Sequence, residues 1–79
     1  MIDVLFFGPV VERVGSAALK VAYQPGMSLQ NLRDQLSAQY PHAFDIVCFS
    51  AVDGHHVRDL SQPLADNSEV TFMAKFSGG

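Results

Sequence analysis

The sequence predicts an α+β fold in which one main helix packs on a mixed sheet of about four to five strands. Two patterns support this prediction. Residues 29–40 carry leucine or tyrosine at intervals of three and four, which is the spacing of the buried stripe of an amphipathic helix. Residues 70–76 repeat with a period of two, as in a strand with one buried face. Because strand-like segments flank the helix on both sides, we expect its apolar stripe to cover one face of a single sheet.

The segment before the helix contains two predicted strands. Residues 2–7 are rich in β-branched and aromatic side chains and end at a Gly-Pro pair, which indicates a buried first strand. Residues 10–15 form a turn or a single helical turn closed by a glycine. Residues 18–23 alternate loosely, and we expect them to pair with the first strand. Ser28 is a favourable N-cap for the helix, and Pro41 ends it because the residue before a proline disfavours the helical conformation.

The segment after the helix contains the remaining strands. Residues 45–52 predict a third strand, in which we expect Cys48 to be a buried, inert thiol. Gly54 belongs to an Asp-Gly turn signal, after which a short return strand begins near His56. A second turn over residues 63–68 leads into the last strand.

Length and composition indicate one small globular domain. The chain has 79 residues, of which 48% are hydrophobic and 16% charged. We expect residues 1–76 to form this domain and residues 77–79 to protrude as a flexible Gly-Gly tail. A single cysteine excludes an internal disulfide framework and fits a reducing compartment, so the expected location is cytoplasmic.

The charge distribution argues against nucleic acid and membranes as partners. The net charge is −3, and the five Lys and Arg residues are scattered without a basic stripe, so a basic protein surface is a better complement. No apolar run approaches the roughly 20 residues that span a bilayer. The N-terminal segment lacks the charged region and cleavage site of a signal peptide.

No set of residues has the pattern of an active site. His55 and His56 are neighbours, so in a strand they point to opposite faces, and a solvated hairpin turn explains them better than a metal site. His42 follows a proline and is expected in a loop. The carboxylates form no evident acid–base pair, and no glycine-rich phosphate-binding loop is present. We therefore expect no bound cofactor and no metal.

The chain ends on Ser77-Gly78-Gly79, which adds little to a core because glycine buries no side chain. A pair of glycines can enter a narrow channel, and it presents a carboxylate that a partner enzyme could activate. The alternative interpretation is a frayed terminus or a cloning remnant.

The whole chain resembles the MoaD/ThiS sulfur-carrier proteins, and most closely the small subunits of molybdopterin synthase. No single motif is specific, but the order and spacing of the set are. The matching stretches are Val4–Gly8, Val11–Gly15, the 28–36 helix, Ala51–Gly54, Pro63–Phe72 and Ser77–Gly79.

This resemblance implies a ubiquitin-like β-grasp fold and a function as a carrier without catalysis of its own. A ubiquitin-activating-type adenylyltransferase, like MoeB, adenylates the Gly79 carboxylate with ATP and magnesium. A sulfur donor protein then converts it to a thiocarboxylate. The tail, with Gly78 and Ser77 in a narrow channel, inserts into a MoaE-like large subunit of molybdopterin synthase. There the sulfur passes to a pterin precursor in molybdenum cofactor biosynthesis.

The sequence departs from the family pattern at two places. Many synthase small subunits have a Pro-Pro pair where this chain has Ala74-Lys75, so the root of the tail is less stiff and the downstream partner is left open. Asn67 replaces the usual glycine of the last turn and tolerates left-handed backbone angles nearly as well.

A partner-binding surface is expected near the last strand. The helix cannot cover all the large apolar side chains, and Phe49 is one of them. We expect Phe7, Met73, Lys75 and Phe76 to contact the activating enzyme and the acceptor, with burial in the core as the alternative.

Three other functions stay open. The carrier could serve another sulfur product, such as the thiamine thiazole, cysteine or a thiolated metabolite. It could be a ubiquitin-like modifier whose Gly79 is joined to lysines of other proteins. It could also be a β-grasp interaction domain with an inert tail.

Overall fold

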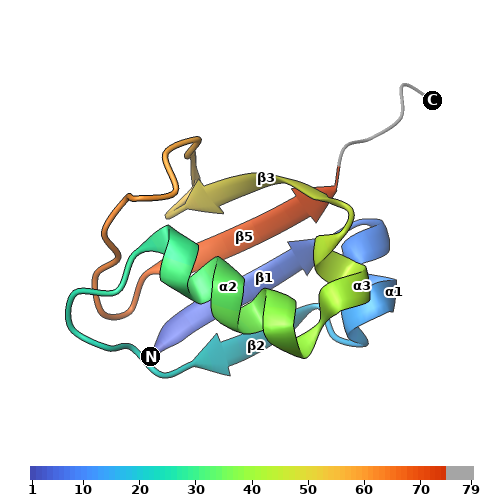
Figure 1. Ribbon diagram of the computed structural model, residues 1–79, viewed down its shortest axis with the longest axis horizontal. Helices are drawn as coiled ribbons and strands as arrows, with labels where there is room; N and C mark the ends of the chain where they lie inside the picture. Colours follow the sequence, from blue (N-terminus) through green and yellow to red (C-terminus); the bar gives the residue numbers. More distant parts are fainter. Residues whose placement is uncertain (75–79) are drawn as a thin grey trace.

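The computed structural model of the protein describes residues 1–74 (Figure 1). They form five strands and three helices. The predicted domain boundary after residue 76 and the tail of residues 77–79 lie outside the described residues. In chain order the elements are β1 (Ile2–Phe7), α1 (Pro9–Val14), β2 (Ala18–Val21), α2 (Leu29–Gln39), α3 (Pro41–Phe44), β3 (Val47–Val52), β4 (His55–His56) and β5 (Glu69–Ala74).

The five strands form one mixed sheet in the order β2-β1-β5-β3-β4. The two central strands, β1 and β5, are parallel, and the other neighbours are antiparallel. Helix α2 covers one face of the sheet, while α1 and α3 lie at the end where β1 and β5 finish (Figure 1). This arrangement confirms the predicted α+β fold with one main helix on a mixed sheet.

Helix α2 begins with a reciprocal cap. The Ser28 hydroxyl accepts a hydrogen bond from the Asn31 backbone N–H at 3.2 Å, and the Asn31 side-chain oxygen accepts one from the Ser28 backbone N–H at 2.9 Å. Two N–H groups that the helix leaves unpaired are thereby satisfied. The predicted N-cap at Ser28 is confirmed.

The chain after α2 forms a further helical turn that the sequence did not predict. Pro41 ends α2, but it is also the first residue of α3, and His42 lies in this helix rather than in a loop. The physical reason is that proline is tolerated at the first helical position, where its missing N–H has no intrahelical partner.

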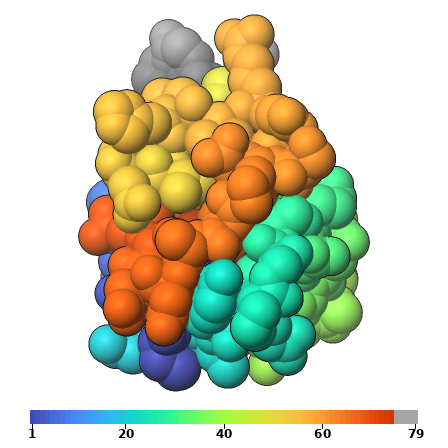
Figure 2. Space-filling view, turned by 90° about the vertical axis from the view of Figure 1, so that its left-hand side faces the viewer, coloured from blue at the N-terminus to red at the C-terminus, as the bar shows by residue number. Residues whose placement is uncertain are grey.

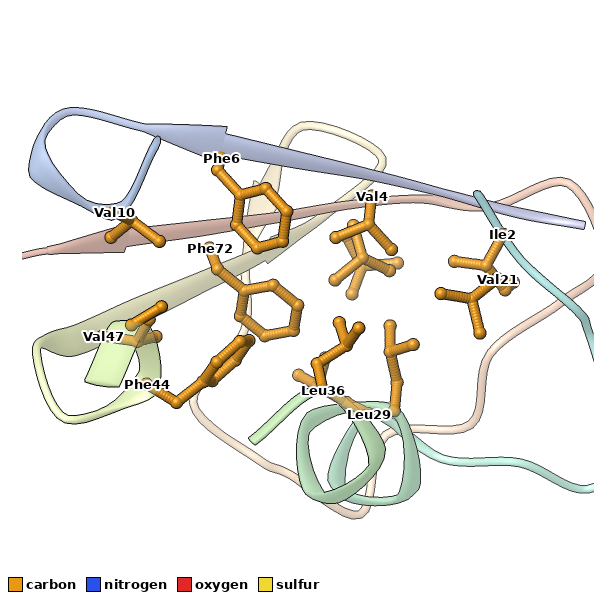
Figure 3. Close-up of a cluster of buried hydrophobic side chains, with 14 of the residues drawn as sticks. Ile2, Val4, Phe6, Val10, Val21, Leu29, Leu36, Phe44, Val47 and Phe72 are labelled. Carbon is orange, nitrogen blue, oxygen red and sulfur yellow. The ribbon is translucent and has the colours of Figure 1, made fainter. Parts of the chain in front are cut away.

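The core lies between the sheet and α2 (Figure 3). Leu29, Leu32 and Leu36 of α2 are fully buried, as their spacing predicted. They face the inward side chains of β1 and β5, among which Phe6 and Phe72 are buried. This helix stripe accounts for one face of the sheet and leaves the opposite face without a helix (Figure 1).

Strand β3 contains an irregularity that overturns the prediction for Cys48. Val47 pairs with Ala74 and Phe49 pairs with Met73, so β3 has one more residue than β5 between these two pairs. The additional residue, Cys48, interrupts the alternation of faces, as in a β-bulge. Its side chain is exposed, whereas a regular strand would have placed it in the core.

The loop that precedes β5 is held against the start of α2 (Figure 2). The backbone N–H of Gln30 donates to the Leu60 carbonyl at 2.8 Å, and that of Leu29 donates to the Gln62 carbonyl at 2.9 Å. Asn67, near the end of this loop, has φ of 67°, a left-handed backbone angle that asparagine tolerates. Among residues 1–74, no helix combines the length and apolar character that crossing a bilayer requires.

Candidate functional site

The carboxyl end of β5 is the place from which the expected tail continues. Ala74 is the last residue of β5, and the residues after it in the sequence must start at this end of the sheet. Strand β5 lies between β1 and β3, so both neighbours contribute side chains beside this position. The site is therefore centred on a strand that the sheet holds on both sides.

Three large apolar side chains lie in a row across the uncovered face at this end. Phe7 of β1 pairs with Met73 of β5, and Met73 pairs with Phe49 of β3. Phe7 is 51% exposed, Phe49 is 43% exposed, and Met73 is half-buried. We call these three residues the apolar row. It spans three adjacent strands, and a contiguous exposed apolar patch often marks an interaction site.

The alternation of each strand explains the row. Phe6 and Phe72 point to the core, so their neighbours Phe7 and Met73 point to the opposite face. The core interpretation is thus wrong for Phe7 and Phe49. Of the predicted partner-binding residues, the structure brings Phe7 and Met73 together.

The other predicted site residues lie outside the described residues. These are Lys75, Phe76, Ser77, Gly78 and Gly79.

A hollow of about 500 Å³ adjoins the row at the β3–β4 edge of the sheet. Phe49 belongs to both features, and its ring contacts that of His56 edge-to-face at a centroid distance of 6.1 Å. Two arginines, Arg33 of α2 and Arg58 after β4, also line the hollow. We call this hollow the basic pocket. Its full lining is Arg33, Cys48, Phe49, Ser50, His56, Val57, Arg58 and Leu60.

The sequence did not predict the basic pocket. Arg33 lies on the main helix and Arg58 follows the short return strand, so only the packing of α2 beside β3 brings them together. Arg33 donates from Nη2 to the Val47 carbonyl at 3.4 Å, which links the helix to this strand. Arg33 and Arg58, which are 25 positions apart in the sequence, thus line the same hollow.

Metal-ligating and titratable side chains of the described residues can be considered together. Among residues 1–74, no three His, Cys, Asp or Glu side chains gather in a way that could hold a metal ion. Two carboxylates have perturbed acidity, and each has a local cause. The Ser61 hydroxyl donates to Asp59 and lowers the pKa of that carboxyl. The N-terminal ammonium donates to Asp66 at 2.7 Å and lowers its pKa.

Comparison with solved structures identifies the fold. SAMP1 from Haloferax volcanii superposes with a TM-score of 0.83 at 18% identity, covering 99% of this chain and 98% of that one. A putative molybdopterin converting factor, subunit 1, from Pyrococcus furiosus gives 0.83 at 15% identity, covering 95% and 97%. A complex of subunits 1 and 2 of the molybdopterin-converting factor from Helicobacter pylori gives 0.67 at 23% identity, covering 99% and 97%. No curated protein sequence matches the chain.

These likenesses, with the mixed sheet and its single main helix, define a ubiquitin-like β-grasp protein. The family is shown by the sequence itself, because residues 4–79 match the model of the ThiS family. The chain belongs to the ThiS family, and the resemblance to the MoaD/ThiS proteins is confirmed.

Proposed function

We propose that this protein is a sulfur carrier that receives and donates sulfur at the carboxyl group of Gly79. The observation that supports this most directly is the match to the ThiS family, which extends through residue 79 and so includes Gly78 and Gly79.

The proposed chemistry takes place in partner active sites. A carboxylate oxygen of Gly79 attacks the α-phosphorus of ATP, and pyrophosphate leaves, so that an acyl-adenylate forms. The outer sulfur of a persulfide on a donor protein then attacks the acyl carbon, and AMP leaves. A thiol next cleaves the S–S bond to the donor, forms a disulfide with the donor sulfur and releases the Gly79 thiocarboxylate. The adenylyltransferase supplies ATP and magnesium, and the carrier itself holds no cofactor. Gly78 and Ser77 would pass through the enzyme's channel because small side chains fit there.

The acceptor that we propose is a pterin precursor bound to the large subunit of molybdopterin synthase, in molybdenum cofactor biosynthesis. The support is the similarity to subunit 1 of the Pyrococcus furiosus and Helicobacter pylori converting factors, the second of which is in complex with subunit 2. In this function the chain is the sulfur-donating subunit of a synthase and has no activity alone. We place this pathway in the cytoplasm.

The apolar row is the proposed docking surface for these partners. Interfaces favour aromatic side chains and methionine at their centre, and Phe7, Met73 and Phe49 supply both types in one continuous strip. The strip lies at the end of the sheet where the tail begins. A partner that contacts it would therefore be close to the C-terminus. Lys75 and Phe76 are proposed to extend the same surface.

A second function is supported by the likeness to SAMP1 from Haloferax volcanii and to small archaeal modifier protein 1 from Methanosarcina acetivorans. In a modifier, the activated Gly79 would form an amide with a lysine of another protein. A sulfur carrier for a different product also shares the first step, and Ala74-Lys75, in place of a Pro-Pro pair, keeps this possibility open.

The test is an ATP–pyrophosphate exchange assay with the adenylyltransferase from the same organism. The chain should stimulate exchange, and a variant with one residue added after Gly79 should not. The added residue lies beyond the described core, so folding should be unchanged. Exchange that is equal with both proteins, or absent with both, would contradict activation at Gly79. High-mass conjugates in cell extracts would favour the modifier over the carrier.

A further inference from the structure

The basic pocket differs from the rest of the described surface in its charge. The chain has a net charge of −3, yet no Asp or Glu belongs to the lining of this pocket within residues 1–74. Arg33 and Arg58 supply its positive charges, and His56 also lines it. The pocket is thus a cationic hollow on an acidic protein, which favours an anionic occupant.

Its two arginines also lack a carboxylate partner among the described residues. Lys20 lies 3.3 Å from the Asp3 carboxylate, whereas Arg33 donates to a backbone oxygen, the Val47 carbonyl, at 3.4 Å. Within residues 1–74, by contrast, neither Arg33 nor Arg58 forms an ion pair with a carboxylate. Guanidinium groups bind carboxylates through paired hydrogen bonds, so two of them around one hollow can hold an acidic side chain.

The position of the pocket suggests where that acidic side chain comes from. Phe49 lines the pocket and is also the last member of the apolar row, so the two features are continuous. The row lies beside the end of β5, and the pocket extends from Phe49 along the β3–β4 edge, where His56 lies level with Thr71. Any enzyme that takes the C-terminus into its active site must approach this end of the sheet.

We propose that the basic pocket receives an Asp or Glu side chain of the adenylyltransferase that activates Gly79. This inference rests on the proposed function, and it adds a specific charged contact to the apolar docking surface. A central apolar strip with a charged contact at its edge is a common design of specific interfaces. The charged contact mainly raises the rate of association and excludes wrong partners.

The test compares two charge reversals of equal size. Arg58→Glu alters the pocket, at an exposed side chain outside any helix or strand. Lys20→Glu is the control, because Lys20 is exposed on β2, at the opposite edge of the sheet from β4. The dissociation constant for the adenylyltransferase from the same organism is measured by calorimetry at low and high salt, after thermal melting has shown that both variants are folded.

We expect Arg58→Glu to raise Kd about tenfold or more at low salt, and Lys20→Glu to change it less than about twofold. At high salt, the Kd values of the wild type and of Arg58→Glu should differ less, because salt screens an exposed ion pair. If both variants change Kd alike while the wild type binds, the pocket proposal is overturned and the proposed function stands. If the wild type itself does not bind, the proposed function fails and this inference fails with it.

A second measurement locates the contact without a substitution in the pocket. Cys48 lines the pocket and is exposed, so iodoacetamide should alkylate it in the free protein. In the saturated complex, mass spectrometry of the carrier should show that alkylation of Cys48 is slowed several-fold. Alkylation at the same rate in the free and bound carrier would place the enzyme elsewhere and overturn the proposal.

Discussion

Phe49 of β3 lies opposite Met73 of β5, directly after the irregular residue Cys48, and the residue is 43% exposed. One additional residue in β3 therefore decides which side chains face the core and which face water. The bulge exposes Cys48, and Phe49 completes the apolar row beside the end of β5. The apolar row and the basic pocket, which we propose as docking features, both contain Phe49 and therefore depend on its pairing with Met73.

Replacing Phe49 with alanine should weaken binding of the adenylyltransferase more than it weakens the fold. We expect Kd to rise about tenfold, as for an aromatic side chain near the centre of an interface. The free energy of unfolding should fall by about 1 kcal/mol, because the ring is only partly buried. Calorimetry and urea denaturation measure the two effects. Phe49→Leu, which keeps an apolar side chain, should retain most of the affinity, and equal affinity for wild type and Phe49→Ala would remove Phe49 from the interface.

Asn67 should tolerate glycine but not valine. Its φ of 67° lies in the left-handed region, which glycine adopts freely and β-branched residues resist. Asn67→Val should lower the free energy of unfolding by about 1–3 kcal/mol, while Asn67→Gly should stay within about 0.5 kcal/mol of wild type. Urea denaturation of the pair tests this. Similar stability for both variants would show that the turn does not require this backbone angle.

Cys48 should react with a thiol reagent in the native protein. A buried thiol would react with the reagent only after unfolding, whereas an exposed thiol, such as that of Cys48, reacts in the native protein. Alkylation followed by intact mass measurement should give one full equivalent without denaturant, at a rate close to that in urea. Strong protection in the native state would mean that β3 lacks the bulge and that Cys48 lies in the core.

The acidity of Asp59 should depend on Ser61. The Ser61 hydroxyl donates to the Asp59 carboxylate at 2.6 Å and lowers its pKa. Because the folded pKa lies below the unfolded one, this contribution to stability is present above the unfolded pKa and is lost as the pH falls through the folded pKa. Ser61→Ala should raise the Asp59 pKa in an NMR titration. Its destabilisation should be larger at about pH 7 than at about pH 2. An unchanged pKa in the variant would contradict this cause.

The parts of the fold with strong local signals could be predicted from the sequence. The leucine spacing of α2 and the period of β5 report which face is buried, and Ser28 marks the helix start through its own hydrogen bond. Helix α3 could not be predicted, because Pro41 can end one helix and begin the next. The bulge at Cys48 could not be predicted either, since it depends on the register with β5.

The candidate site likewise contains residues that the sequence could predict and residues that it could not. Phe7 and Met73 could be predicted as surface residues because each alternates with a core residue of its strand. The basic pocket depends on tertiary packing, which brings Arg33 beside Arg58 from a distant part of the chain. The residues of the tail are predicted from the terminal Gly-Gly pair and from the family resemblance, and they lie outside the described residues.

The most direct test of the carrier function is mass spectrometry of the protein purified from its own cells. The intact mass and the C-terminal peptide should show that sulfur replaces one oxygen at Gly79. Methionine oxidation gives a nearly equal mass change, and the chain has three Met, so the change must be localised and tested by alkylation. A thiocarboxylate at Gly79 is the result we predict. A carboxylate that persists after incubation with the matching adenylyltransferase, ATP and a sulfur donor would contradict it.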